Sequence, residues 1–146
     1  MNIYIEKRVH YYFCEKDLNC ASAALHIVLE YFDIAIEKQV LDSAVGMHGA
    51  GGYRAQCGIV EGVLMSIGIV CRNRNIADDE TVLLCRGFAQ KFENEFNSLS
   101  CEVLRPNGFN DNDPPHLCEG LTVDGIRFGI VFIAEWLEKI PDEISL

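Results

Sequence analysis

The sequence predicts an all-α, single-domain helical bundle of about five to six helices over residues 1–146, with a Gly-rich loop before the central helix. Apolar residues recur at helical spacing through most of the chain. Outside the first five residues, no stretch shows the sustained apolar–polar alternation of a strand. With 49% hydrophobic residues and no internal repeat or linker, the chain is expected to bury one core without disulfides.

The first predicted helix runs from Cys20 to Phe32, because its apolar residues form a single stripe. Asp17 or Asn19 is expected to cap it, since short polar side chains satisfy the first free backbone N–H groups. A shorter amphipathic helix follows, roughly from Ile36 to Val45. It is expected to end in the glycine-rich loop at residues 46–52.

The central helix is predicted from Arg54 to Val70, with Gly58 and Gly62 four residues apart on one side. Paired glycines allow another helix to approach closely. A clearer amphipathic helix is predicted from Asp78 to Phe96, with Asp78 or Asp79 as its cap. Both helices carry enough apolar residues to contribute to the core.

The last third of the chain contains a short helical piece, a loop and a final helix. One or two turns are predicted over Ser98 to Leu104, and a polar loop over Arg105 to Pro115. The final helix is predicted from about His116 to Lys139. Asp111 and Asp113 lie in the loop before it and are expected to cap it.

Charge and hydropathy exclude several classes of partner. The formal net charge is −10 and no basic cluster is present, which disfavours nucleic acids and anionic membranes as partners. No apolar stretch is long enough to insert into a membrane, and the first residues do not resemble a secretory signal. A cytoplasmic location is therefore expected. A homodimer is compatible with the close-packing glycine faces, although no residue requires it.

The seven cysteines are the most informative residues, at positions 14, 20, 57, 71, 85, 101 and 118. Their odd number and wide spacing, with no signal sequence, disfavour a structural disulfide framework. No Cys-x-x-Cys pair is present, so neither a thioredoxin-like dithiol nor a zinc ribbon is predicted from local spacing. The thiols are core fillers, metal ligands or redox-active groups.

Predicted helix starts separate the cysteines into two groups. Four lie near helix N-termini: Cys20, Cys57, Cys101 and Cys118. Free N–H groups and the helix dipole favour negative charge there, so these thiols are expected to ionise more easily. The remaining three are expected to be bystanders: Cys14, Cys71 and Cys85.

The same four cysteines carry a resemblance to a known family. The motifs are Asn19-Cys20-Ala21, Cys57-Gly58-Ile59-Val60-Glu61-Gly62, Ser100-Cys101-Glu102-Val103-Leu104, and Cys118 at the start of the last helix. In order and interval they resemble the C-GCAxxG-C-C family, whose members are described as redox-active, and the resemblance covers residues 19–137. One position departs from the pattern: Ile59 stands where the family has Ala.

The resemblance implies a redox or electron-transfer protein whose partner is a redox protein or a small thiol or electron donor. A similar helical module is associated with iron–sulfur binding in the split-Soret type of multihaem cytochrome. One interpretation is therefore an iron–sulfur cluster held by Cys20, Cys57, Cys101 and Cys118. The other is dithiol–disulfide chemistry at Cys57 and Cys20, with Cys57 as the attacking thiolate. The alternative from another class is a zinc-binding or purely structural helical protein.

Backbone and side chains near the thiols complete the candidate site. The glycines Gly51, Gly52 and Gly58 are expected to bring backbone N–H groups close to a thiolate or a cluster sulfur. His48 and His116 precede Cys57 and Cys118 in the sequence and are open as ligands or proton carriers. Glu61 lies one turn after Cys57, and its role is open as well.

Overall fold

A computed structural model describes residues 1–139, and within this range the chain forms helices and no strand. The predicted all-α class is confirmed. Five helices have nine residues or more: α1 (Asn2–His10), α2 (Cys20–Tyr31), α5 (Gly58–Asn73), α6 (Asp78–Phe96) and α8 (Glu119–Leu137). The shorter elements are η1 (Tyr11–Glu15), α3 (Lys38–Ala44), α4 (Gly49–Gly52) and α7 (Cys101–Leu104). None of the described helices is long and apolar enough to span a bilayer.

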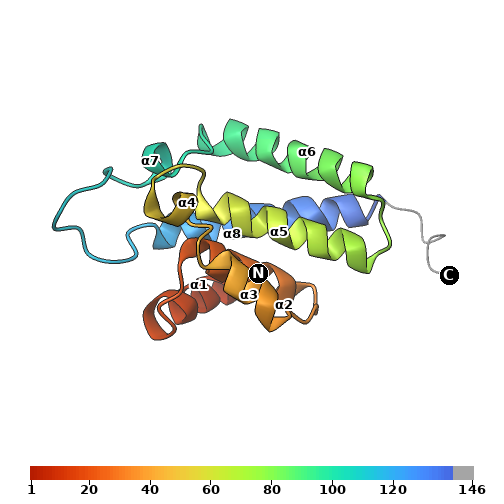
Figure 1. The fold of residues 1–146 in the computed structure, drawn as a ribbon, viewed down its shortest axis with the longest axis horizontal. Helices are drawn as coiled ribbons and strands as arrows, with labels where there is room; N and C mark the ends of the chain where they lie inside the picture. Colours follow the sequence, from red (N-terminus) through yellow and green to blue (C-terminus); the bar gives the residue numbers. More distant parts are fainter. Residues whose placement is uncertain (140–146) are drawn as a thin grey trace.

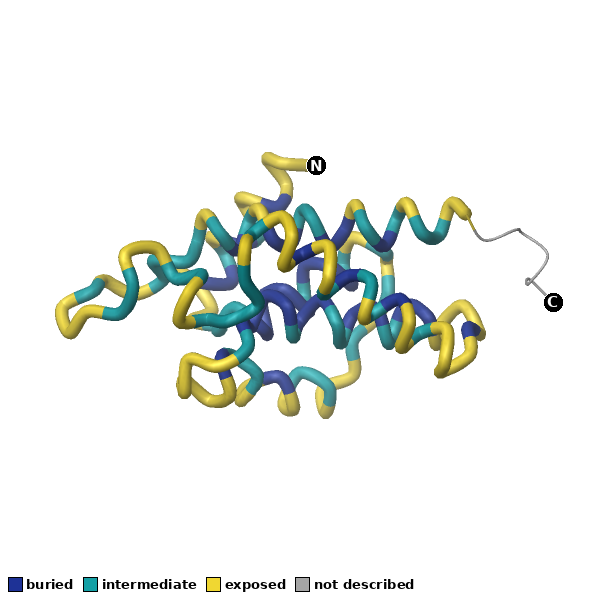
Figure 2. Tube along the Cα trace, turned by 90° about the horizontal axis from the view of Figure 1, so that it is seen from above, coloured by how far each residue is buried: buried dark blue, intermediate teal, exposed yellow. Residues whose placement is uncertain are grey.

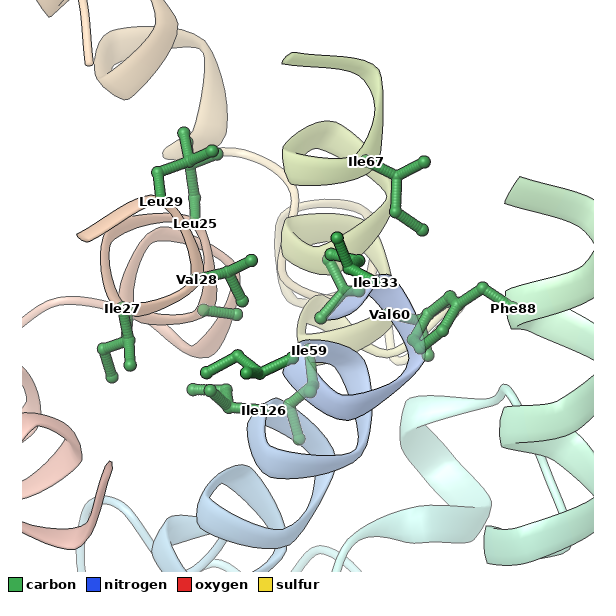
Figure 3. Close-up of a cluster of buried hydrophobic side chains, with 14 of the residues drawn as sticks. Leu25, Ile27, Val28, Leu29, Ile59, Val60, Ile67, Phe88, Ile126 and Ile133 are labelled. Carbon is green, nitrogen blue, oxygen red and sulfur yellow. The ribbon is translucent and has the colours of Figure 1, made fainter. Parts of the chain in front are cut away.

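Helix α5 lies in the middle of the bundle and packs against α2, α6 and α8 (Figure 1). Its apolar residues, with those of α2 and α8, point into a common core (Figure 3). Ile59 of α5 and Ile126 of α8 are completely buried, as is Phe88 of α6. Burial is accordingly densest along the central helices, while the loops at both ends are exposed (Figure 2).

Glycines allow α5 to approach both neighbours closely. A Cβ at Gly62 would lie 2.7 Å from the Cβ of Ala24 in α2. A Cβ at Gly129 of α8 would lie 2.9 Å from a methyl group of Val63. The predicted close packing at the Gly58–Gly62 face is therefore present, and it fixes the axial register of α2 against α5.

Helices α5 and α8 both begin later than the sequence predicts. Helix α5 starts at Gly58 rather than Arg54, because the preceding residues pair with the segment before α7 in a short antiparallel bridge, Gln56 with Ser100. Helix α8 runs over Glu119–Leu137 rather than from His116 to Lys139. His116 has a φ of 64°, which a right-handed helix cannot accommodate.

The helix caps agree with the sequence at one position and differ at others. Asn19 accepts a hydrogen bond from the Ser22 N–H at 2.9 Å, as predicted for the start of α2. Helix α6 is preceded by Ala77, so Asp78 and Asp79 belong to its first turn. Asp113 does not cap α8. It accepts a hydrogen bond from the Asn110 N–H and pairs with Arg105 inside the loop.

The glycine-rich loop before α5 forms a left-handed turn. Helix α4 has positive φ angles at all four of its residues: 63° at Gly49, 55° at Ala50, 68° at Gly51 and 84° at Gly52. Glycine adopts this conformation without steric cost, whereas an L-residue is strained in it. Helices α4 and α7 lie together at one end of the molecule (Figure 1). That end holds the candidate site.

Candidate functional site

A pocket of about 260 Å³ opens at the end of the bundle where α4 and α7 lie. Three cysteines line it: Cys20 from the start of α2, Cys101 from the start of α7, and Cys118 immediately before α8. The other lining residues are Phe13, Asn19, His48, Gly52, Arg54, Arg105, Phe109 and His116. The fourth predicted cysteine, Cys57, is not a lining residue and is only 4% exposed.

Cys20 and Cys57 are brought together by the close contact of α2 with α5. The capped start of α2 fixes Cys20, and its Sγ lies against the side of Gly58 from which a Cβ would project. A Cβ at Gly58 would fall on that sulfur atom and would also lie 3.0 Å from the Ala21 backbone nitrogen. Because Cys57 immediately precedes Gly58, the glycine allows both thiols to lie at the same end of the helix pair.

Cys57 and Cys101 are brought together by backbone pairing. The Cys57 N–H donates to the Leu99 carbonyl at 2.8 Å, and the Cys101 N–H donates to the Ala55 carbonyl at 2.7 Å. The left-handed turn of α4 packs over this bridge. A Cβ at Gly49 would lie 3.4 Å from the Cβ of Cys101, in ordinary contact.

Burial raises the pKa of all four thiols, which corrects the expectation that they ionise easily. Desolvation raises the pKa of Cys20 to about 12, and that of Cys57 to about 11. The N–H groups of Ile59 and Val60 favour the Cys57 thiolate, but they do not outweigh desolvation. Burial likewise raises the pKa of Cys101 and of Cys118. The helix N-termini are present, yet loss of solvent dominates.

The four thiols also share one electrostatic environment. Negative charge on Cys57, Cys101 or Cys118 would raise the pKa of Cys20 further, and the other pairs affect one another in the same way. The sulfur atoms are nonetheless not packed as tightly as ligands of a single ion. Within residues 1–139, no three of these four sulfur atoms lie within 4.8 Å of one another.

The pocket is basic in a protein that is strongly acidic. Arg54 and Arg105 line it, and no carboxylate does among the described residues. Both guanidinium groups lie over the Phe109 ring, that of Arg54 at 4.2 Å and that of Arg105 at 4.5 Å from the ring centroid. Asp113 pairs with Arg105 at 3.3 Å and neutralises part of its charge. The Arg105 guanidinium still favours the thiolates of Cys101 and Cys118, lowering the pKa of each against the effect of burial.

Both candidate histidines line the pocket. The Nδ1 atom of His48 lies 3.0 Å from the Val45 carbonyl, which orients the ring. His116 stacks on Phe13 with centroids 4.7 Å apart, and its Nε2 lies 3.5 Å from Asp17. Neither ring nitrogen belongs to a group of three donor atoms within 4.8 Å in the described part of the chain.

The candidate glycines and Glu61 differ in how close they lie to the pocket and to its cysteines. Gly52 lines the pocket and Gly58 lies against Cys20, whereas Gly51 is a conformational residue of the α4 turn with open space around it. Glu61 is outside the pocket and accepts a hydrogen bond from the Gln56 side chain at 2.9 Å. Burial raises the pKa of Glu61.

The three cysteines expected to be bystanders are outside the pocket. Cys71 is buried in the core and Cys85 is half-buried against it. Cys14 is exposed on η1, next to His10 and Glu119. All seven cysteines are free thiols.

Sequence reasoning missed the two arginines and Phe109 of the pocket. Phe109 is an aromatic residue in an otherwise polar loop, and Arg105 follows Cys101 by four residues. These were the available signals. Their position beside the cysteines was not predictable, because the sequence of the long loop between α7 and α8 does not determine the path of that loop over the pocket.

The comparison with family models decides the family. The model of the family described as "Putative redox-active protein (C_GCAxxG_C_C)" matches residues 18–129, which is most of the chain. The chain belongs to the C-GCAxxG-C-C family. The match includes all four cysteines of the family pattern, Cys20, Cys57, Cys101 and Cys118, and the predicted resemblance is confirmed. No curated protein and no solved structure matches this C-GCAxxG-C-C protein.

Proposed function

We propose that this C-GCAxxG-C-C protein is an electron carrier that binds an iron–sulfur cluster through Cys20, Cys57, Cys101 and Cys118. The observation that supports the proposal is that these thiols lie at one end of the bundle and share one electrostatic environment, although 97 residues lie between the first and the last. Four thiolates are the ligand set that iron–sulfur clusters use most. When bound, the cluster would supply one-electron transfer.

The charges around the pocket support an anionic occupant. A cluster with four thiolate ligands carries net negative charge, and Arg54 and Arg105 lie beside the thiols. Positive charge and hydrogen bonds near cluster sulfur favour the reduced state and so raise the reduction potential. In this proposal the two arginines set the potential, and Phe109, which both guanidinium groups contact, limits access of water.

The pKa values favour metal ligation over dithiol chemistry. A nucleophilic cysteine needs a substantial thiolate fraction near neutral pH. Cys57 is buried with a pKa of about 11, and the pKa of Cys20 is about 12. A bound metal centre overcomes the cost of deprotonating these buried thiols, because its positive charge displaces the thiol protons.

The spacing of the sulfur atoms favours a cluster over a single zinc ion. Zinc–sulfur bonds of about 2.3 Å in a tetrahedron place the sulfur atoms about 3.8 Å apart. No three of the four sulfur atoms come within 4.8 Å of one another in the described residues. A polynuclear cluster separates its thiolate ligands more widely, so its ligation requires less contraction of the site.

The test is anaerobic reconstitution of the full chain with ferrous iron and sulfide. We expect stoichiometric iron and sulfide, visible absorption from sulfur-to-iron charge transfer, and reversible bleaching by dithionite. Each of the substitutions Cys20→Ser, Cys57→Ser, Cys101→Ser and Cys118→Ser should lower the cluster yield. Cys85→Ser is the matched control, because Cys85 is a half-buried thiol outside the pocket, and it should leave the yield unchanged.

Two results would contradict the proposal. Protein that retains zinc and takes up no iron or sulfide would favour the zinc-binding alternative. Metal-free protein whose Cys20 and Cys57 oxidise reversibly to a disulfide would favour dithiol chemistry.

The control variant has an outcome of its own. Loss of cluster in Cys85→Ser as well would show that the cluster yield reports protein stability rather than ligation by the substituted cysteine.

A further inference from the structure

We propose that His10, Cys14 and Glu119 form a second, surface metal site that takes a zinc-like divalent ion. The sequence gives no indication of it, because Glu119 lies more than a hundred residues from the other two. One donor atom from each residue lies within 4.8 Å of the others, and no other such group of three occurs in residues 1–139. The site does not depend on the proposed cluster, since it shares no residue with the pocket.

The two distances from His10 are close to those between ligands of one ion, and all three donor atoms lie within 4.8 Å of one another. The Nδ1 atom of His10 lies 3.5 Å from the Cys14 Sγ and 3.1 Å from the Glu119 Oε1. Tetrahedral zinc with ordinary bond lengths separates a nitrogen from a sulfur ligand by about 3.6 Å, and a nitrogen from an oxygen ligand by about 3.4 Å.

The backbone holds two of the donors in place. The chain widens from α1 into the π-helical turn η1 at Tyr11, so His10 ends one element and Cys14 lies in the next. π-Helical turns are rare and occur frequently at functional sites. Tyr12 and Phe13, between the two donors, are buried and anchor this turn to the core. Helix α1 also packs along α8, which carries Glu119 in its first turn.

The chemistry of the donors indicates which ions fit. One imidazole, one thiolate and one carboxylate are borderline ligands that suit zinc better than magnesium or calcium, which prefer all-oxygen sites. The side chains of His10 and Glu119 are 63% and 39% exposed, so a water molecule can complete a fourth position. Binding releases the Cys14 thiol proton and involves no redox change.

The test measures alkylation of Cys14 in the metal-free full-length protein, with and without zinc chloride, by mass spectrometry of the peptide that contains Cys14. The peptide readout separates this site from zinc bound at the pocket cysteines. In the wild type, zinc at ten times its dissociation constant should slow alkylation of Cys14 about tenfold. His10→Ala and Glu119→Gln should remove most of this protection, because each removes one ligand.

Glu15→Gln is the matched control. It removes an exposed carboxylate adjacent to Cys14 that is not part of the group, so zinc protection should stay at the wild-type level. Circular dichroism of each variant checks that it is folded, which is expected because the altered side chains are at the surface. If zinc does not slow alkylation of Cys14 in the wild type, the site does not exist. If zinc protects Cys14 equally in all variants, the thiol binds zinc alone and the three-residue site is wrong.

Discussion

At Cys57, burial and helix-terminal N–H groups act on the same sulfur in opposite directions. The sequence predicted that the start of a helix would lower the pKa of this thiol, and the structure does place it immediately before α5. The side chain is almost fully buried, however, and desolvation outweighs the N–H groups of Ile59 and Val60. Position along a helix is visible in a sequence, whereas solvent exclusion depends on what the rest of the chain packs over it.

This balance predicts slow, pH-dependent alkylation of the buried thiols in metal-free protein. With a pKa of about 11, the Cys57 thiolate should grow about tenfold per pH unit between pH 7 and 10, and its alkylation rate with it. The folded state also holds these protons more tightly than the unfolded chain. The free energy of unfolding of the metal-free protein should therefore fall as the pH rises above about 8.5.

Iodoacetamide labelling resolved by peptide mapping measures the rates, and urea titrations at several pH values measure the free energy. The exposed Cys14 is the internal reference for reagent reactivity. If Cys57 reacts at pH 7 as fast as Cys14, the thiol is not shielded and the argument against dithiol chemistry loses its basis.

Gly58 is the residue on which the position of Cys20 depends most directly. In Gly58→Ala the new methyl group would fall on the Cys20 sulfur and press on the Ala21 backbone. We expect a loss of about 1–3 kcal/mol of stability, and a lower yield of cluster because Cys20 is displaced. Urea denaturation and iron analysis measure the two effects.

Gly68→Ala is the matched control, because Gly68 lies on the same helix with nothing within 4 Å of its missing Cβ. Alanine favours helix there, so this variant should gain up to about 1 kcal/mol and keep the full cluster yield. Equal losses in both variants would show that glycine at position 58 has no special packing role.

At the scale of elements, the long helices from α2 onward were predictable, whereas α1, η1 and the junctions between helices were not. Periodicity located α2, α3, α5, α6 and α8, because each buries one apolar face. The start of α5 was placed four residues too early, since residues 54–57 pair with residues 99–102 across a long sequence separation. The same pairing brings Cys57 close to Cys101. Local patterns contain no information on such a contact.

The left-handed turn of α4 gives a prediction at this scale. Gly51 has a φ of 68° and open space around it, so Gly51→Ala adds strain without a steric clash. We expect a loss of about 1–2 kcal/mol in the free energy of unfolding. Gly46→Ala, in the same loop but without a positive φ, should change it by less than about 0.5 kcal/mol. Chemical denaturation measures the free energy of unfolding of both variants. If Gly51→Ala leaves this free energy unchanged, the left-handed turn geometry is wrong.

At the scale of the whole molecule, the four cysteines come from four segments that are far apart in the sequence and lie at one end of the bundle. Helix starts and the family pattern single them out in the sequence, but only the fold shows which of them line one pocket. The basic lining was not predictable from a chain of net charge −10, because Arg54 and Arg105 are separated by 50 residues and meet only around Phe109.

A ligand that connects these segments should stabilise the molecule. A cluster that binds only the folded state adds about 2.7 kcal/mol at a hundred times its dissociation constant, which corresponds to a rise of about 10 °C in Tm. Anaerobic thermal unfolding of reconstituted and metal-free protein measures this rise in Tm. In Cys101→Ser the same treatment should raise Tm much less, and an equal rise there would indicate iron bound elsewhere.

The central claim is that Cys20, Cys57, Cys101 and Cys118 act as one site, and differential alkylation tests it most directly. The reconstituted protein and the metal-free protein are labelled anaerobically at pH 9, and labelling is quantified at each of the seven cysteines by mass spectrometry. The account predicts that the cluster protects these four together, while Cys14, Cys71 and Cys85 label equally with and without it. Protection of only some of the four, or of cysteines outside the pocket, would contradict the account.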